Sequence, residues 1–261
     1  RARSSRTRPA PPGCLELSQT LRPSFPLLPT AAMENPLPFD LPSSVPGITL
    51  PDVVLFPQGS LPLYIFEPRY RRMLEEVMDS SGLMLVVTRA ADTTETQENP
   101  EPFHPQATLG MVQSSEKNPD GTSQIVIQGL LRVQAGPREK DEPYPVFSIR
   151  PVPSEPGADS AELESRVQRL LALVRRRSEL DNRIPRELLR FLEGLDDPDA
   201  LTDLTAHTLI GPTAEKLRLL ETPEVTARFE RPFELLGQDI TELDLEARLR
   251  GGLSDDDVSR N

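Results

Sequence analysis

The 261-residue sequence is poor in the residues that usually carry covalent, redox or metal chemistry. It has one cysteine, Cys14, two histidines, His104 and His207, and no tryptophan. A lone cysteine cannot form an intramolecular disulfide, and neither histidine has a second histidine, cysteine or carboxylate at the spacing of a metal site. We therefore expect no metal, no cofactor and a reducing, cytoplasmic compartment.

Catalytic motifs are missing as well. The phosphate-binding pattern GxxxxGK[ST] does not occur, and the nearest stretch, GMVQSSEK at positions 110–117, lacks the second glycine. The sequence has only three lysines, Lys117, Lys140 and Lys216, all in polar or charged stretches. We expect none of them to be a desolvated nucleophile. The sequence thus predicts a protein that is not an enzyme.

Neither a membrane nor a nucleic acid is favoured as a partner. No run of eighteen apolar residues is present, so we expect no membrane association. The chain has a net charge of −12, and residues 1–32 carry five arginines and one glutamate, so the other 229 residues carry −16. A body this acidic is a poor general binder of phosphate backbones.

Proline is concentrated near the N-terminus, where 13 of the 29 prolines precede Leu63. We expect residues 1–47 to form an extended, disordered arm. The arginine-rich opening is compatible with an organellar transit peptide, although its prolines disfavour the amphipathic helix that such a peptide needs. The alternative is that Met33 is the true start, with residues 1–32 upstream sequence or a disordered extension. Residues 251–261 form an acidic tail, also expected to be disordered.

Residues 48–154 have the short apolar and β-branched runs of a β domain. The six predicted strands cover residues 48–56, 60–66, 82–89, 107–115, 123–134 and 144–152. NPDG at positions 118–121 predicts a hairpin, because proline presets one turn position and glycine accepts positive φ. The polar stretch at 90–106 is long enough to be a mobile loop.

One helix is inserted among these strands, in LPLYIFEPRYRRMLEEVM at positions 61–78. Pro68 suits a first helical turn, since its missing N–H would have no partner there. The apolar residues that follow recur at the spacing of one buried helix face, and they are Tyr70, Met73, Leu74, Val77 and Met78.

Residues 155–250 predict a helical domain. Apolar residues recur at helical spacing over 163–174, 185–195, 198–209 and 213–220, and a further helix begins near Thr222. We expect that last helix to kink or break at Pro232, which lacks an N–H and crowds the carbonyl four residues back.

Several of these segments resemble the substrate-binding domain at the N-terminus of Lon-type ATP-dependent proteases. The more specific ones are LPDVVLFPQGSLPLYIFEPRYRRMLEEV, LGMVQ and GLLRVQ, and DLTAHTLIGPTAEKLRLLETPEVTARFE is similar to the helical part. The resemblance implies an α+β fold, in which a PUA-like small, largely antiparallel β-barrel with one inserted helix precedes an all-α helical bundle. It also implies a binding role, without the ATPase and protease domains of that family.

We therefore expect a non-catalytic module that recognises unfolded or client polypeptides through exposed apolar segments. The candidate contact residues lie near the junction of the two domains, and they are Phe56, Leu63, Phe66, Tyr70 and Met111. All five could instead be ordinary core. The alternative is a structural or regulatory adaptor that binds one folded partner, such as a protease, through the helical domain. RNA binding, which is known among PUA-like domains, is disfavoured by the acidic body. The sequence is compatible with either a monomer or a homo-oligomer.

Overall fold

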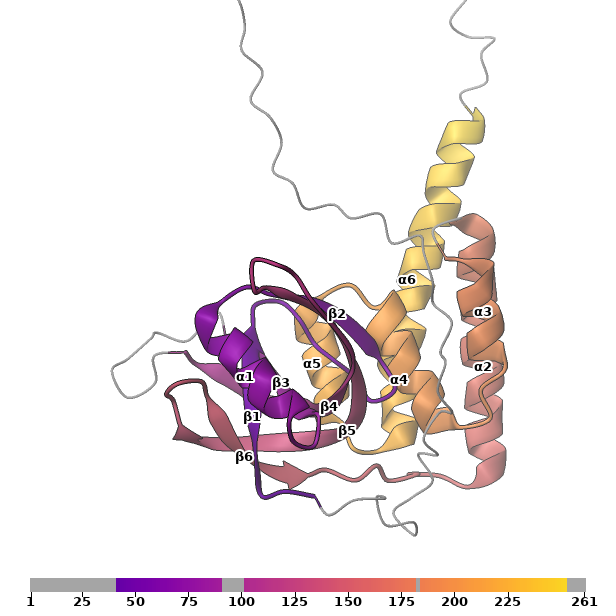
Figure 1. Ribbon diagram of the computed structural model, residues 1–261. Coiled ribbons are helices and arrows are strands. Elements are labelled where there is room, and N and C mark those ends of the chain that lie inside the picture. The colour runs from indigo at the N-terminus through magenta and orange to yellow at the C-terminus, as the bar shows by residue number, and fades with distance from the viewer. Residues whose placement is uncertain (1–40, 91–100, 182–183, 253–261) are drawn as a thin grey trace, which may run out of the picture.

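The computed structural model describes residues 41–90, 101–181 and 184–252. Predictions for the arm before residue 41, including Cys14 and Met33, and for the tail after residue 252 lie outside these ranges. The strands are β1 (Ser44–Leu50), β2 (Ser60–Ile65), β3 (Leu83–Arg89), β4 (Phe103–Lys117), β5 (Ser123–Lys140) and β6 (Val146–Pro151). The helices are α1 (Pro68–Met78), α2 (Ser160–Leu180), α3 (Arg186–Glu193), α4 (Pro198–Leu209), α5 (Thr213–Glu221) and α6 (Val225–Gly252). The predicted α+β class is confirmed (Figure 1).

All six strands belong to one sheet in the order β2-β5-β4-β3-β1-β6. β6 also pairs with the second half of β5, so hydrogen bonding runs around a ring of five strands. β2 pairs only with the first half of β5. Every pairing except the parallel one of β1 with β3 is antiparallel, in agreement with the predicted largely antiparallel sheet.

The predicted hairpin joins β4 to β5. The N–H of Asn118 donates to the carbonyl of Thr122 at 2.8 Å, and the N–H of Gly121 donates to that of Asn118 at 2.9 Å. Gly121 has φ +83°, a conformation that glycine adopts without steric cost. The local sequence therefore determines this turn.

The amphipathic pattern of α1 is confirmed for four of its five apolar positions. Tyr70, Met73, Leu74 and Val77 are buried against strand residues of the same core cluster. Met78 is 48% exposed instead, because it is the last residue of the helix and extends past the sheet.

The segment 51–59 is not strand, contrary to the prediction for 48–56. The chain turns away after Leu50, and Asp52 and Gln58 both have positive φ. The side chains of Val54 and Phe56 are buried among residues of α4 and α5 instead of the sheet. An apolar, β-branched run indicates burial, but it does not indicate in which core the run is buried.

Other boundaries also differ from the prediction. β1 begins at Ser44, before the expected start of the β domain at residue 48, and Gly251 and Gly252 belong to α6. β4 begins at Phe103, inside the stretch expected to be a loop, of which residues 91–100 lie outside the described ranges. The linker after residue 154 is held in place, since the N–H of Val225 donates to the carbonyl of Glu155 at 2.7 Å.

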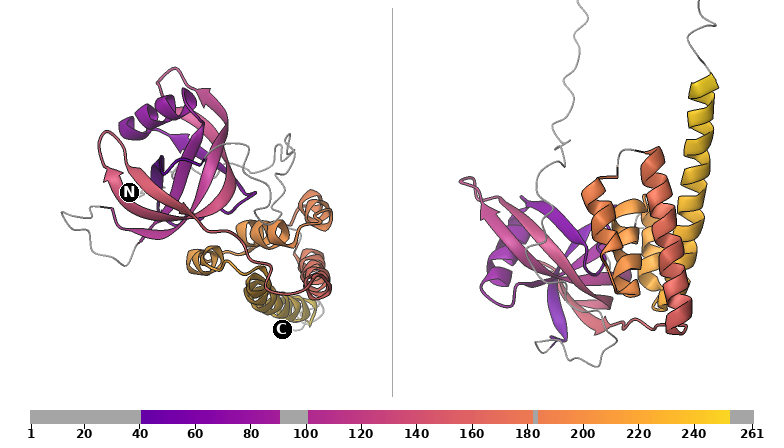
Figure 2. Two further views of the ribbon diagram at one scale, coloured as in Figure 1. Left: turned by 90° about the horizontal axis from the view of Figure 1, so that it is seen from below. Right: turned by 90° about the vertical axis from the view of Figure 1, so that its right-hand side faces the viewer.

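The helices begin and end within about three residues of the predicted positions, except that α2 extends six residues past the predicted end at 174. Asp159 and Asp197 cap α2 and α4 by accepting backbone N–H groups. The expected break at Pro232 does not occur, because α6 continues through that residue. Phe229, Phe233 and Leu236 are buried against α2 and α4, and this packing outweighs the lost backbone hydrogen bond. The C-terminal part of α6 extends beyond the other helices (Figure 2).

A buried cluster of charges joins the sheet to the helices. Arg132 of β5 donates to both carboxylate oxygens of Asp203 on α4. Arg228 of α6 donates to Asp203 at 2.8 Å and also to Asp199. Two positive and two negative side chains, none more than 6% exposed, thus balance one another. Arg228 also donates to the hydroxyl of Ser154 at 2.8 Å.

We predict that Arg228→Met lowers the free energy of unfolding by about 3–5 kcal/mol, because it leaves a buried carboxylate without its partner. Arg176→Met is the matched control, since Arg176 is 48% exposed and pairs with Glu179 and Asp244 at the surface. The control should cost about 1 kcal/mol or less. Chemical denaturation measures both, and equal losses would contradict the assigned role of the cluster.

Candidate functional site

The structure places the five predicted contact residues in different environments. Phe56 and Tyr70 are buried, at 0% and 3% exposure, so they present no surface to a ligand. Leu63 and Met111 are half-buried and pack against two different core clusters. Phe66 alone is prominent, at 60% exposure.

The large apolar side chains that are exposed in the described ranges form two groups. Tyr64, Phe66 and Met78 lie on β2 and at the two ends of α1, whereas Leu245 and Leu249 lie near the end of α6. Met78 of the first group also lines a groove in the β domain. We call Tyr64, Phe66 and the neighbouring edge of β2 the β2 surface.

Alternation along β2 explains why its aromatic side chains are exposed. Leu61, Leu63 and Ile65 pack against the core, so the intervening residues point to the opposite face. Tyr64 is on that face and is 52% exposed. Phe66 follows the strand and stacks on Tyr64, with ring centroids 6.3 Å apart and an interplanar angle of 25°.

The hairpin holds Tyr64 in position. Its hydroxyl donates to the Oγ1 of Thr122 at 2.8 Å. Thr122 is fixed in turn, because its N–H donates to the carboxylate of Asp120 at 2.9 Å, and its hydroxyl donates to the same oxygen. These two hydrogen bonds lower the pKa of Asp120. The exposed aromatic pair is therefore ordered by polar contacts beneath it.

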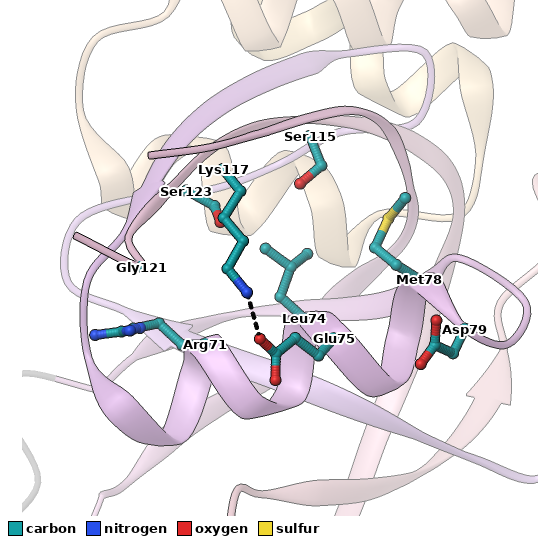
Figure 3. Close-up of a pocket in the computed structure, with 9 residues that line it drawn as sticks. All are labelled: Arg71, Leu74, Glu75, Met78, Asp79, Ser115, Lys117, Gly121 and Ser123. Carbon is teal, nitrogen blue, oxygen red and sulfur yellow. Dashed lines mark hydrogen bonds and ion pairs between the residues drawn. The ribbon is translucent and has the colours of Figure 1, made fainter. Parts of the chain in front are cut away.

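A groove of about 360 Å³ lies between α1 and the β4–β5 hairpin (Figure 3). Leu74 and Met78 supply its apolar surface, and Lys117 reaches across it to Glu75 with an N–O distance of 2.7 Å. Its lining consists of Arg71, Leu74, Glu75, Met78, Asp79, Ser115, Lys117, Gly121 and Ser123. An ion pair therefore crosses a groove with an apolar side.

Charges beside this groove are locally paired. The hydrogen bond from Lys117 and the charge of that lysine lower the pKa of Glu75. On the other flank of α1 the hydroxyl of Tyr144 donates to Glu76. Burial and this hydrogen bond raise the pKa of Tyr144 to about 12. Of the charged side chains that line the groove, Glu75 and Lys117 are paired with each other, and Arg71 and Asp79 bring opposite charges.

His207 joins the helical domain to β2, and Lys216 supports His207; neither lines this groove. The Nε2 of His207 donates to the carbonyl of Ser60 at 3.1 Å, and burial lowers the pKa of the imidazole. Lys216 donates to the carbonyl of His207 at 2.9 Å. Burial also lowers the pKa of Lys216, which corrects the expectation that no lysine is desolvated. Its partner is a backbone carbonyl, and it is not part of the lining of the groove between α1 and the hairpin.

We also looked in the described residues for metal-binding groups and membrane-spanning helices. Within the ranges of the structure, no three His, Cys, Asp or Glu side chains gather in a way that could hold a metal ion. His104 lies in β4 and not in the expected loop. Across the same ranges, no helix has the length and apolar character needed to span a bilayer.

Sequence reasoning missed Tyr64 and Met78. The signal for Tyr64 was available, because two-residue alternation in LPLYIF separates Leu61, Leu63 and Ile65 from the residues between them. Which of the two sets faces solvent depends on the tertiary structure. The exposure of Met78 likewise depends on where the core ends.

Comparison with known proteins gives one family. The sequence model of the ATP-dependent protease La (LON) substrate-binding domain matches residues 44–238. Lon protease of Xanthomonas oryzae is 29% identical over 229 residues, which are 87% of this chain and 27% of that protein. Lon protease of Escherichia coli K12 is 29% identical over 208 residues, or 79% of this chain and 26% of that protein. The chain therefore spans about a quarter of the length of these relatives.

Solved structures agree in fold. The N-terminal domain of Mycobacterium avium complex Lon protease superposes with a TM-score of 0.58 at 20% identity, covering 76% of this chain and 98% of that one. The Lon N-terminal domain protein from Xanthomonas campestris gives a TM-score of 0.52 at 18% identity, with coverage of 72% and 95%.

We predict that Lys117→Met raises the pKa of Glu75 toward the ordinary glutamate value, because the carboxylate loses its hydrogen bond and the opposite charge. In the unsubstituted protein the ion pair is complete above the ordinary glutamate pKa and is lost as the pH falls through the lowered one. Carbon-13 NMR titration of the Glu75 carboxyl measures the shift. Lys140→Met is the control, since Lys140 lies over the Tyr144 ring and should leave the pKa of Glu75 unchanged.

Proposed function

Because the chain belongs to the family of ATP-dependent protease La (LON) substrate-binding domains, we propose that it is a non-catalytic module that binds unfolded polypeptides by their exposed apolar segments. The binding region in this proposal is the β2 surface together with the groove between α1 and the hairpin. We use the word client for a partially unfolded protein. An exposed apolar segment of a client would pack against the exposed apolar side chains of this region. The PUA-like character of the β domain also remains part of the proposal.

The observation that carries the proposal is the ordered, exposed aromatic pair of Tyr64 and Phe66. Exposed rings that already stack lose little conformational freedom on binding, so more of the energy of burying them contributes to affinity. Aromatic side chains are also the commonest residues to contribute strongly at protein interfaces. Met78, at the far end of α1, adds a flexible apolar contact that suits varied clients.

The groove between α1 and the hairpin extends the same region. Leu74 lies in it, and Met78 borders it at the end farthest from Phe66. Its charged side chains, among them Glu75 and Lys117, neutralise each other, so the groove selects little by charge. A surface of this kind discriminates exposed from buried apolar segments and does not require one sequence.

A second candidate function is an adaptor that binds one folded partner through the helical domain. The observation in its favour is the end of α6, which extends beyond the other helices and exposes Leu245 and Leu249 (Figure 2). These leucines are one turn apart, so they lie on one face of the helix. The two candidate functions use different surfaces, and substitutions can therefore separate them.

We predict that the double variant Tyr64→Ser/Phe66→Ser weakens binding of a permanently unfolded, reduced and carboxymethylated polypeptide about tenfold or more. Fluorescence anisotropy at physiological salt measures the affinity of the labelled polypeptide. The double variant Leu245→Ser/Leu249→Ser is the matched control, because it removes two equally exposed apolar side chains elsewhere and should leave the Kd within twofold. Equal affinity for the native and the unfolded form of the polypeptide would disprove the proposed function.

For the adaptor we predict the converse pattern. Crosslinking in native cells should give one partner in stoichiometric amount, lost in Leu245→Ser/Leu249→Ser and kept in Tyr64→Ser/Phe66→Ser. A broad spread of captured proteins that disappears with the aromatic residues would instead favour the client-binding function.

A further inference from the structure

We infer that the free edge of β2 takes up the client as an added β-strand, so that the ligand is an extended polypeptide backbone with apolar side chains at alternate positions. This inference rests on the proposed function, and it specifies the conformation and chemical class of what is bound at the β2 surface. It follows from which backbone groups of β2 are already used.

The register of β2 on β5 shows which of its residues hydrogen-bond to that strand. The N–H of Gly129 donates to the carbonyl of Gly59 at 2.8 Å, at the start of an antiparallel pairing that continues with Leu61 opposite Ile127. Hydrogen-bonded and non-hydrogen-bonded pairs alternate in such a pairing. The backbone groups of Leu61, Leu63 and Ile65 therefore face β5, and those of Ser60, Pro62 and Tyr64 face the opposite edge.

Two independent features agree with this assignment. The carbonyl of Ser60 accepts from Nε2 of His207 on α4, a helix that lies on the side of β2 away from β5. Pro62 has no N–H, and a proline is tolerated in a strand where its missing donor would face an unpaired edge. The start of the edge is thus covered by α4, and from Pro62 onward no strand of the described residues pairs with it.

The open part offers a carbonyl at Pro62 and both a carbonyl and an N–H at Tyr64. In the ranges that the structure describes, no strand lies on this side of β2. Acceptors and donors repeated at the spacing of alternate strand residues match the backbone of another extended chain. A helix cannot supply this pattern, because its own backbone groups are already paired, and a folded partner can supply it only from an unpaired edge strand.

The side chains next to this edge determine which extended chain fits. Tyr64 is exposed on the outward face, and Phe66 stacks on it just beyond the strand, so residues of an added strand on that face contact aromatic rings. β-branched and aromatic residues pair best with aromatic residues across neighbouring strands. The net charge of −12 disfavours acidic segments. The expected ligand is therefore an alternating apolar and neutral segment, such as an exposed β-strand of an unfolded protein.

The test uses a nine-residue peptide, Lys-Thr-Val-Thr-Phe-Thr-Val-Thr-Lys, and two N-methylated forms of it. In one form the Val and Phe nitrogens are methylated, and in the other the inner Thr nitrogens are methylated. Successive residues of an extended chain direct their N–H groups to opposite edges, so only one set faces β2. We expect one methylated form to lose at least tenfold in affinity and the other to bind within about threefold of the parent peptide, as measured by anisotropy.

A pair of protein variants tests the same edge from the other side. Tyr64→Ala and Tyr64→Pro both remove the ring, but only the second removes the N–H that faces the open edge. Tyr64→Pro should bind the peptide at least threefold more weakly than Tyr64→Ala. Its melting temperature should equal that of Tyr64→Ala, because this N–H makes no bond to β5.

Each failure has a distinct meaning. Absence of binding by the parent peptide and by unfolded polypeptide would overturn the proposed function itself. Binding with equal tolerance of both methylated forms would overturn only strand addition, leaving an aromatic surface that binds without backbone contacts. Concentration-dependent dimers that are lost in Tyr64→Pro would show that a second copy occupies the edge, and would overturn the inference as well.

Discussion

The buried charge cluster of Arg132, Asp199, Asp203 and Arg228 is the constraint on which the rest of the structure depends. Each charge is costly to remove from water, and each is tolerated only because the others lie within hydrogen-bonding distance. Arg132 is on a strand, the two aspartates are on α4, and Arg228 is on α6. The charges can therefore be satisfied together only when the sheet and the helices are docked in one arrangement.

This arrangement has consequences for the β2 surface. With α4 held against the sheet, His207 reaches the carbonyl of Ser60 and covers the beginning of β2. The segment 51–59 lies between the sheet and the helices, where Val54 and Phe56 are buried among residues of α4 and α5. The helical domain thus determines where the covered part of the edge ends and the open part begins. If the β2 surface binds clients as proposed, the helical domain contributes by positioning that surface.

Much of the fold could be predicted where short-range patterns determine the structure. The burial of Tyr70, Met73, Leu74 and Val77 follows from helical periodicity, and the hairpin at Gly121 follows from its turn residues. The segment containing Phe56 was misassigned, because its apolar run is buried against helices more than 140 residues away in the chain. Pro232 was misjudged for a similar reason, since the packing of Phe229 and Phe233 preserves a helix that the local rule would end.

The candidate binding region was less predictable than the fold. Phe66 is exposed, but Phe56 and Tyr70 proved to be core, and Tyr64 and Met78 were not recognised as exposed. Whether an apolar residue is exposed depends on what packs over it, and that is decided by the order of strands in the sheet. Among the described residues β2 pairs with one strand, and this position is a property of the whole sheet that no local sequence motif encodes.

Pro62 has a consequence for solubility. Two molecules that joined their β2 strands edge to edge would each bring a proline, so the junction would lack two hydrogen bonds, whereas a foreign strand at the same edge forgoes only one. At about 0.5–1.5 kcal/mol for each bond, pairing of two β2 strands into a dimer is penalised more than pairing of β2 with another chain. A single proline thus biases this edge against self-association.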